Sequence, residues 1–226
     1  MNPYNPLAEK ISGLCEGKPK GGEQYQNLLK TADSKGVLDI FIPWAAPPSG
    51  RKLNKEDLRT IAYTFGDEGL VNSLSSAVRT RTIVMPADSY AQRNGFDMDK
   101  ANQYWSDVRE TIGQTSVREL IWLPSSVIEQ WPSYTKYRAT EAYALEKLDP
   151  KTREKIVDAA SKYNADSPDS YESAAEYAMG RAAEGRVVRD MGALWVSLNW
   201  PERDAMCGDT PRIYTPIEVR TPWLKE

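Results

Sequence analysis

Residues 37–55 read VLDIFIPWAAPPSGRKLNK, and the prediction of the fold starts from this segment. Val37–Ile42 is an apolar run interrupted only by Asp39, which is typical of a strand covered on both faces. Prolines, small residues and cations follow, so we expect the strand to end in a polar loop. Asn54 then suits the N-cap of a helix with an acidic first turn.

Two further strands are predicted downstream, at Thr82–Met85 and Arg118–Leu123. Asp97 is expected to cap a helix between them, because Met98–Ile112 carries one apolar stripe at helical spacing. The resulting β-α-β-α-β order with long crossovers indicates parallel strands. We therefore predict an α/β, Rossmann-like fold with a mostly parallel central sheet and helices on both faces.

The rest of the chain is predicted to be helical and then to return to the sheet. Helices are expected at Tyr134–Lys147, from Pro150 through Tyr163, and from Ser167–Pro168 to about Asp190. The last segments, Ala193–Asn199 and Arg212–Val219, are expected to add an antiparallel strand pair, with Pro216 favouring an edge position.

Nothing in the sequence resembles an interdomain linker, so one domain over residues 1–226 is expected. Glycines and a proline interrupt the first 36 residues, which we interpret as a partly ordered lead-in with a short helix at Gln24–Thr31. The predicted parts are the lead-in (1–36), the β-α-β-α-β core (37–123), a helical region (124–191) and C-terminal strands (192–226).

The composition excludes several kinds of chemistry. The chain of 226 residues has no histidine, which removes Ser-His-Asp and Cys-His catalysis and every histidine metal site. Cys15 and Cys207 show no metal-ligand spacing, so no metal site is predicted. The 29 basic and 32 acidic residues give a net charge of −3, which argues against a large nucleic-acid footprint. No apolar run is long enough for a membrane span, and a cytoplasmic location is expected.

Cations and a carboxylate follow the first two strands. Arg51, Lys52 and Lys55 lie at a loop-to-helix junction, where they suit a phosphate or carboxylate, or form a solvated basic loop. Asp88 follows the second strand and is either a base or ammonium ligand, or a turn former. Ligands bind outside the carboxyl ends of parallel strands, so we expect the two loops to form one pocket.

Further candidates lie after Asp88 and near the end of the chain. Tyr90 is interpreted as a hydrogen-bond donor to substrate or as packing, and Arg93 in the same loop is counted with the substrate-binding residues. Arg181 and Glu184 share a helix face and form either part of a site or a surface ion pair. Ser197 and Asn199 point the same way from one strand, as a pocket wall or an exposed face.

Four segments in order resemble the isonitrile (isocyanide) synthase family. They cover a quarter to a third of the chain: FIPWAAPPSGRKLNK (41–55), RTIVMPADSYAQRNGFDMDKANQYWSDVR (81–109), LWVSLNWP (194–201) and TPW (221–223). The likeness has three departures, one of which is that the chain is shorter than usual for the family. Asn199 and Leu224 stand where the family pattern has histidine.

This resemblance implies a reaction and a set of roles. The amine of a free amino acid, such as tryptophan or tyrosine, would condense with ribulose 5-phosphate without a metal or redox cofactor. Arg51 and Lys52 would clamp the phosphate, and Asp88 would orient the ammonium or move a proton. Ser197 and Asn199 would line the pocket, with Asp88, Glu184 and Asn199 counted as catalytic. Arg181 and Glu184 would assist with the carboxylate and with proton transfer.

Two other interpretations stay open. The plan of the chain also resembles cyclodipeptide synthases, which use aminoacyl-tRNAs and need a nucleophilic serine in the first loop. Only Ser49 is available there, and the helix at 97–112 is not basic. The third interpretation is a non-catalytic module of the same fold that has lost the catalytic histidines and binds a small molecule or a partner. The expected partners are an amino acid and a sugar phosphate, with tRNA only under the second reading, and a homodimer is compatible with the sequence.

Overall fold

Five parallel strands form one sheet in the part of the chain that the computed structural model describes, residues 5–163, 169–198 and 201–219. The strands are Val37–Trp44 (β1), Arg79–Pro86 (β2), Leu120–Trp122 (β3), Ala193–Ser197 (β4) and Arg212–Tyr214 (β5). Their order across the sheet is β3-β2-β1-β4-β5. The chain therefore moves outward from β1 to one edge and resumes at β4 on the other side of β1. The predicted Rossmann-like fold is confirmed, and β1 and β4 flank its topological switch point.

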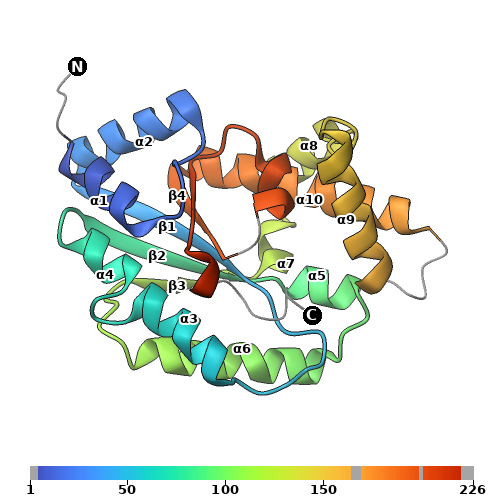
Figure 1. The fold of residues 1–226 in the computed structure, drawn as a ribbon, viewed down its shortest axis with the longest axis horizontal. Helices are drawn as coiled ribbons and strands as arrows, with labels where there is room; N and C mark the ends of the chain where they lie inside the picture. Colours follow the sequence, from blue (N-terminus) through green and yellow to red (C-terminus); the bar gives the residue numbers. More distant parts are fainter. Residues whose placement is uncertain (1–4, 164–168, 199–200, 220–226) are drawn as a thin grey trace.

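Helices cover both faces of this sheet (Figure 1). The helices before β1 and between the first three strands are Pro6–Leu14 (α1), Gly22–Lys35 (α2), Lys55–Phe65 (α3), Leu70–Ser75 (α4), Asp88–Arg93 (α5) and Met98–Gly113 (α6). After β3 they are Ser125–Ile128 (α7), Pro132–Thr140 (α8), Pro150–Tyr163 (α9) and Ser170–Met191 (α10), with 3-10 turns at Pro201–Cys207 (η1) and Ile217–Val219 (η2). None of the described helices is both long and apolar enough to cross a membrane.

The predicted antiparallel pair at the end of the chain is wrong. β4 and β5 pair in parallel, with Trp195 opposite Arg212, because η1 and the following loop return the chain to the amino end of the sheet before β5 begins. An antiparallel contact does occur on β5, but its partner is the early segment: Lys20 bridges Arg212. This bridge covers the outer edge of β5, which would otherwise present unpaired backbone groups.

The early segment is more ordered than predicted. Asn5 caps α1 through a hydrogen bond from the Ala8 amide at 3.0 Å, and α1 buries Leu7 and Ile11. α2 is longer than the predicted Gln24–Thr31 helix. Gly21 before it has φ of +103°, and a side chain there would stand 2.8 Å from the Pro211 backbone. The lead-in is therefore anchored to the C-terminal strands, a contact that local sequence does not reveal.

The middle helices also differ from the sequence prediction. α8 ends at Thr140 rather than at Lys147. α9 begins at the predicted Pro150, and Asp149 accepts a hydrogen bond from the Thr152 amide at 3.0 Å. Ser167–Pro168 lies outside the described residues, and Asp169 caps α10.

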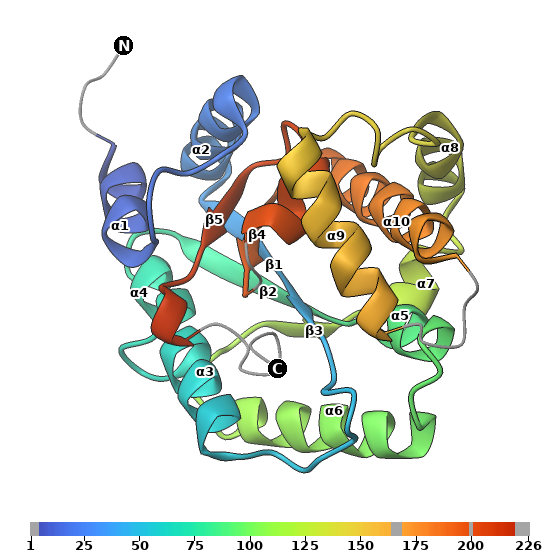
Figure 2. The same ribbon diagram turned by 45° about the vertical axis from the view of Figure 1, so that its right-hand side comes forward.

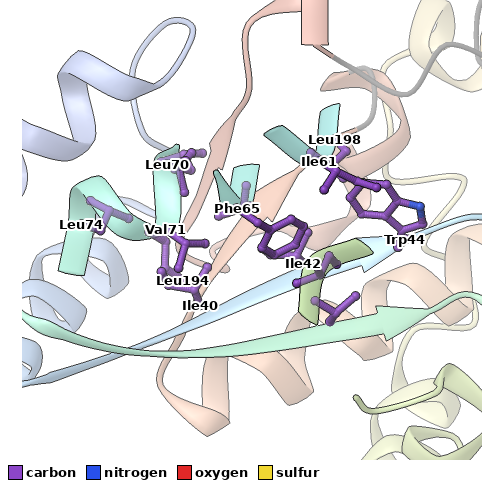
Figure 3. Packing of buried hydrophobic residues seen from close by; sticks show 14 of the residues in the cluster. Ile40, Ile42, Trp44, Ile61, Phe65, Leu70, Val71, Leu74, Leu194 and Leu198 are labelled. Carbon is purple, nitrogen blue, oxygen red and sulfur yellow. The ribbon is translucent and has the colours of Figure 1, made fainter. Parts of the chain in front are cut away.

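One face of β1 packs on α3 and α4. Figure 3 shows Ile40, Ile42 and Trp44 of β1 meeting Phe65 of α3 and Leu74 of α4, and all five are fully buried. Successive strand residues point to opposite faces, so Phe41 lies on the other side of the sheet. There it packs with residues of β2, β4 and α10. The continuous apolar run of β1 therefore reflects burial on both faces, as predicted.

Asp39 is the polar exception in that run, and an ion pair explains it. Arg81 of β2 is its register partner and donates to its carboxylate through Nε at 2.6 Å and Nη2 at 2.5 Å. The arginine side chain is about half exposed. The face of the sheet that carries Phe41 is therefore polar at the amino end of β1.

Removing Leu74 should test the core on the first face. We expect Leu74→Ala to lower the free energy of unfolding by about 2–5 kcal/mol, because it leaves a cavity in a packed core. Leu58→Ala on α3 is the matched control, since this leucine is 47% exposed and its loss should change stability by less than about 0.5 kcal/mol. Urea unfolding measures both, and equal effects would contradict this packing.

Candidate functional site

Polar side chains from five elements meet on the second face of the sheet, beneath α10. We call this group the buried polar cluster; it consists of Tyr90 (α5), Tyr134 (α8), Arg181 and Glu184 (α10), Ser197 (β4) and Asp204 (η1). Four of these residues, Tyr90, Arg181, Glu184 and Ser197, were predicted site residues. Ser197 ends β4, so the cluster borders the switch point where ligands bind in folds of this kind.

The sequence of α10 explains how charged groups come to lie inside the protein. Its buried residues are mostly alanine and glycine, including Ala178, Gly180 and Ala182, which let other elements approach its backbone closely. Arg181 and Glu184 are three residues apart and lie on one face of the helix. Glu184 is 0% exposed and Arg181 is 3% exposed. The alternative of a surface ion pair is therefore wrong.

The Arg181 guanidinium connects three parts of the fold. Its Nη1 donates to Glu184 Oε2 at 2.9 Å, and its Nη2 donates to Asp204 Oδ1 at 2.5 Å. The guanidinium also lies over the Trp195 ring, 4.4 Å from the centroid. Ser197 donates its hydroxyl hydrogen to Asp204 Oδ2. These contacts join α10, β4 and η1 through buried charges, whose pairing is needed to offset their desolvation.

Three oxygens of the cluster lack a hydrogen-bond partner of normal geometry among the described residues. They are Glu184 Oε1 and the hydroxyls of Tyr90 and Tyr134. Both hydroxyls converge on Gly180: a β-carbon there would lie 3.0 Å from the Tyr90 hydroxyl and 3.3 Å from that of Tyr134. Gly180 is one turn before Glu184 on α10. Buried polar atoms are rarely left without partners, so three together indicate a place for a polar ligand group.

The surroundings of Glu184 favour the protonated form of its carboxyl group. Burial raises the pKa of this carboxyl, and Arg181 opposes the rise. The Tyr90 hydroxyl also lies close enough to favour the carboxylate, although their geometry is not that of a normal hydrogen bond. Burial raises the pKa of Tyr90 well above its usual value, and Glu184 adds to the rise. Tyr90 is therefore a neutral hydrogen-bond donor, and Glu184 is a carboxyl able to exchange a proton.

Arg93 covers Tyr90 from the outside. Its guanidinium lies 4.7 Å from the centre of the Tyr90 ring and donates to Glu129 at 2.8 and 3.2 Å. Ser89 also donates to Glu129, at 2.6 Å. Arg93 thus lies next to the cluster but does not enter it.

Asp88 holds two short helices together. Its Oδ1 accepts from the Ser125 hydroxyl at 2.8 Å and from the Ser126 amide at 3.0 Å, and its Oδ2 accepts from the Ser126 hydroxyl. These contacts fix the start of α7 against α5. The geometry fits the structural interpretation of Asp88, and its catalytic role stays a prediction.

The cations after β1 lie apart from the cluster. Arg51 forms an ion pair with buried Asp57, which also accepts from the Tyr104 hydroxyl at 3.2 Å. Lys52 and Lys55 are exposed. Figure 2 shows the chain after β1 turning toward α6 before it enters α3, whereas α5 after β2 lies beside α7. The two loops begin together, with the Ala87 amide 3.0 Å from the Trp44 carbonyl, and then take different directions.

Some predicted residues have no described structure, and two residues of the buried polar cluster were not predicted. Asn199 and the TPW segment at 221–223 lie outside the described residues. Sequence reasoning missed Tyr134 and Asp204, because neither lies in a periodic pattern that marks it as inward-facing. A signal that would have pointed to Tyr134 is Gly180, because a glycine inside a long helix indicates close approach by another group.

The pH dependence of stability should reveal the ionisation of Glu184. Its folded-state pKa is raised above the ordinary 4.5, so the wild type loses stability as pH rises from 4.5 through the raised pKa. Glu184→Gln does not titrate there. We therefore expect its stability relative to the wild type to increase with pH over that window and then to level off, as measured by urea unfolding. Glu176→Gln, at an exposed position on the same helix, should follow the wild type; a parallel curve for Glu184→Gln would contradict the raised pKa.

Comparison with known proteins shows the fold. No family model and no curated protein matches the sequence. A tyrosyl-tRNA synthetase of Leishmania major in complex with tyrosinol matches at 11% identity and a TM-score of 0.58, over 92% of this chain and 31% of that one. The PvcA protein of Pseudomonas aeruginosa matches at 11% identity and 0.57, over 96% and 86%. A cyclo(L-leucyl-L-phenylalanyl) synthase reaches 0.49 at 11%, over 86% and 94%. The chain spans about a third of the synthetase, and the first two likenesses support the Rossmann-like fold.

Proposed function

We propose that this chain is an enzyme that binds an amino acid by its ammonium group at Glu184. One observation carries the proposal: Glu184 Oε1 and the Tyr90 and Tyr134 hydroxyls are buried together without partners of normal geometry among the described residues. An ammonium group has three N–H donors, and these three oxygens are all able to accept. Such a ligand would satisfy these three oxygens, and the buried Arg181 Nε and Trp195 Nε1, which also lack partners among the described residues, would remain for other groups of the substrate.

The charges of the cluster support a cationic ligand. Arg181 is shared between two carboxylates, Glu184 and Asp204, so its positive charge is divided between them. Arg212 is also nearby, but its hydrogen bonds go to the Tyr214 hydroxyl and to backbone carbonyls. A ligand ammonium would supply the second partner that Glu184 lacks. Glu184 would then take the proton that an amine must lose before it attacks a carbonyl carbon.

The more specific proposal is a carbon–nitrogen bond-forming reaction of the isonitrile synthase kind, between this amine and ribulose 5-phosphate. The sequence resemblance supports it, and the fold is compatible with it. To clamp the phosphate, Arg51 would have to exchange Asp57, its partner in the structure, for the ligand. Lys52 and Lys55 are the exposed cations that remain after β1. Ser197 is proposed to line the substrate site within the cluster, whereas the roles of Asp88, Arg93 and Asn199 stay predictions.

A second proposal uses an aminoacyl-tRNA as the source of the amine, as cyclodipeptide synthases do. The fold shared with a tyrosyl-tRNA synthetase in complex with tyrosinol, an aromatic amino alcohol, favours an amine ligand in such a fold. Ser49, the serine that this chemistry would need, is exposed in the loop after β1. Glu184 would bind the same ammonium in both reactions, so the buried polar cluster alone does not separate them.

Ligand binding tests the shared part of both proposals. We expect tyrosinol and tyrosine to bind in isothermal titration calorimetry, and 3-(4-hydroxyphenyl)propionate, which lacks the amine, to bind at least about tenfold more weakly. Glu184→Gln should reduce tyrosinol affinity by a similar factor, because it removes the charge that faces the ammonium. Glu176→Gln on the exposed side of α10 is the control and should bind normally. Equal binding with and without the amine would reject the ammonium site.

Product analysis separates the two reactions. One mixture contains the protein with tyrosine or tryptophan and ribulose 5-phosphate, and another contains it with aminoacyl-tRNAs; mass spectrometry follows both. An isonitrile in the first mixture supports the condensation, and a diketopiperazine in the second supports the tRNA-dependent reaction. Amine binding without either product would support the binding-module interpretation.

A further inference from the structure

Asp204 is the member of the buried polar cluster that comes from outside the sheet and the helices. It lies on η1, is 0% exposed, and accepts from Arg181 Nη2 at 2.5 Å and from the Ser197 hydroxyl. It therefore joins the end of β4 to the centre of α10. The sequence places it in an irregular segment between β4 and β5, where no pattern marks it.

The position of Asp204 decides how Arg181 meets Glu184. A guanidinium has five N–H donors in a rigid plane, and two of them can bind both oxygens of one carboxylate. Here Arg181 gives one nitrogen to each of two carboxylates and uses a single bond, Nη1 to Oε2, for Glu184. The Trp195 ring under the guanidinium restricts its plane as well. Glu184 Oε1 is left open as a result.

Without the carboxylate of Asp204, nothing in the described cluster would hold Nη2 away from Glu184. The guanidinium would rotate in its plane above Trp195 and bind both Glu184 oxygens, because paired parallel hydrogen bonds are the preferred geometry of these two groups. Glu184 Oε1 would then be occupied from within. The ammonium would lose its anionic acceptor even though Glu184 itself is unchanged.

We propose that Asp204 is a positioning residue for the ammonium site: it holds Arg181 so that Glu184 keeps one oxygen for the ligand. This inference rests on the proposed function, which supplies the ligand. It adds a residue that acts through Arg181 and does not touch the substrate. It also assigns the fixed position of η1 a function in ligand binding.

The ionisable groups that face Glu184 define what the test has to control. Arg181 lies beside it on α10 and favours its ionised form, and Glu129 after α7 opposes ionisation. Among the described residues, the other groups around it include Tyr90 and Arg93 on α5, Tyr134 on α8, and Cys207 and Asp204 on η1, with Arg212 of β5 next to the last two. Within the described residues, Asp204 is the carboxylate that competes with Glu184 for Arg181. Its removal should therefore make Glu184 easier to ionise.

The test compares Asp204→Ala and Asp204→Asn with Asp209→Asn. Asp209 is an exposed acid after η1 that pairs with Arg189, so it controls for charge removal in the same segment. In calorimetry across a pH series we expect both Asp204 variants to bind tyrosinol about tenfold more weakly. Asp209→Asn should match the wild type. The asparagine variant keeps the size of the side chain and serves if the alanine variant does not fold.

A ligand-free measurement separates this inference from the proposed function. The carboxyl carbon of Glu184, identified by its absence in Glu184→Gln, is titrated by ¹³C NMR. Loss of Asp204 should move its midpoint to lower pH by about one unit, because Arg181 then binds Glu184 alone. An unchanged midpoint in a folded Asp204 variant would overturn the positioning role. A shifted midpoint in a protein that binds no amine would support the positioning of Arg181 and reject the ammonium ligand.

Discussion

The shared guanidinium of Arg181 is the interaction on which this side of the molecule depends. A buried charge is tolerated only when partners replace the water it has lost, and Arg181 has two carboxylates and an aromatic ring. Each partner comes from a different position in the chain. The alanines and glycines of α10 allow the close approach that this pairing requires. The buried polar cluster therefore positions α10, β4 and η1 relative to one another and also forms the site.

The order of the strands sets where this cluster can lie. The chain leaves the sheet at β3 on one edge and returns at β4 beside β1, so α10 must cross to the second face. The carboxyl ends of β1 and β4 then meet at the switch point, with Ser197 at the end of β4. Residues after β1 turn instead toward α3 and α6, where Arg51 joins Asp57. One parallel sheet thus separates two polar networks on its two faces.

Much of the fold was readable from the sequence because its signals are local. The apolar run Val37–Ile42, the cap at Asn54 and the stripe on Met98–Ile112 each arise from neighbouring residues, and each element is present. The direction of β5 was not readable, because it depends on the path of the chain between strands. The order in the lead-in was missed for the same reason, since its contacts are with Pro211 and Arg212.

The fold class and most element types were predicted from the sequence, and four residues of the cluster were among its candidate site residues, each with a structural alternative left open. The absence of histidine limited the available chemistry. Which charged groups meet depends on the three-dimensional packing of the chain. From the sequence alone, Arg181 and Glu184 on α10 fit a surface ion pair. In the structure both side chains are buried. Asp204 belongs to the cluster because η1 packs against α10, a contact between segments that are separate in the sequence. Local patterns record periodicity and capping, whereas a site is formed by groups distant in sequence whose approach is set by packing of the whole sheet.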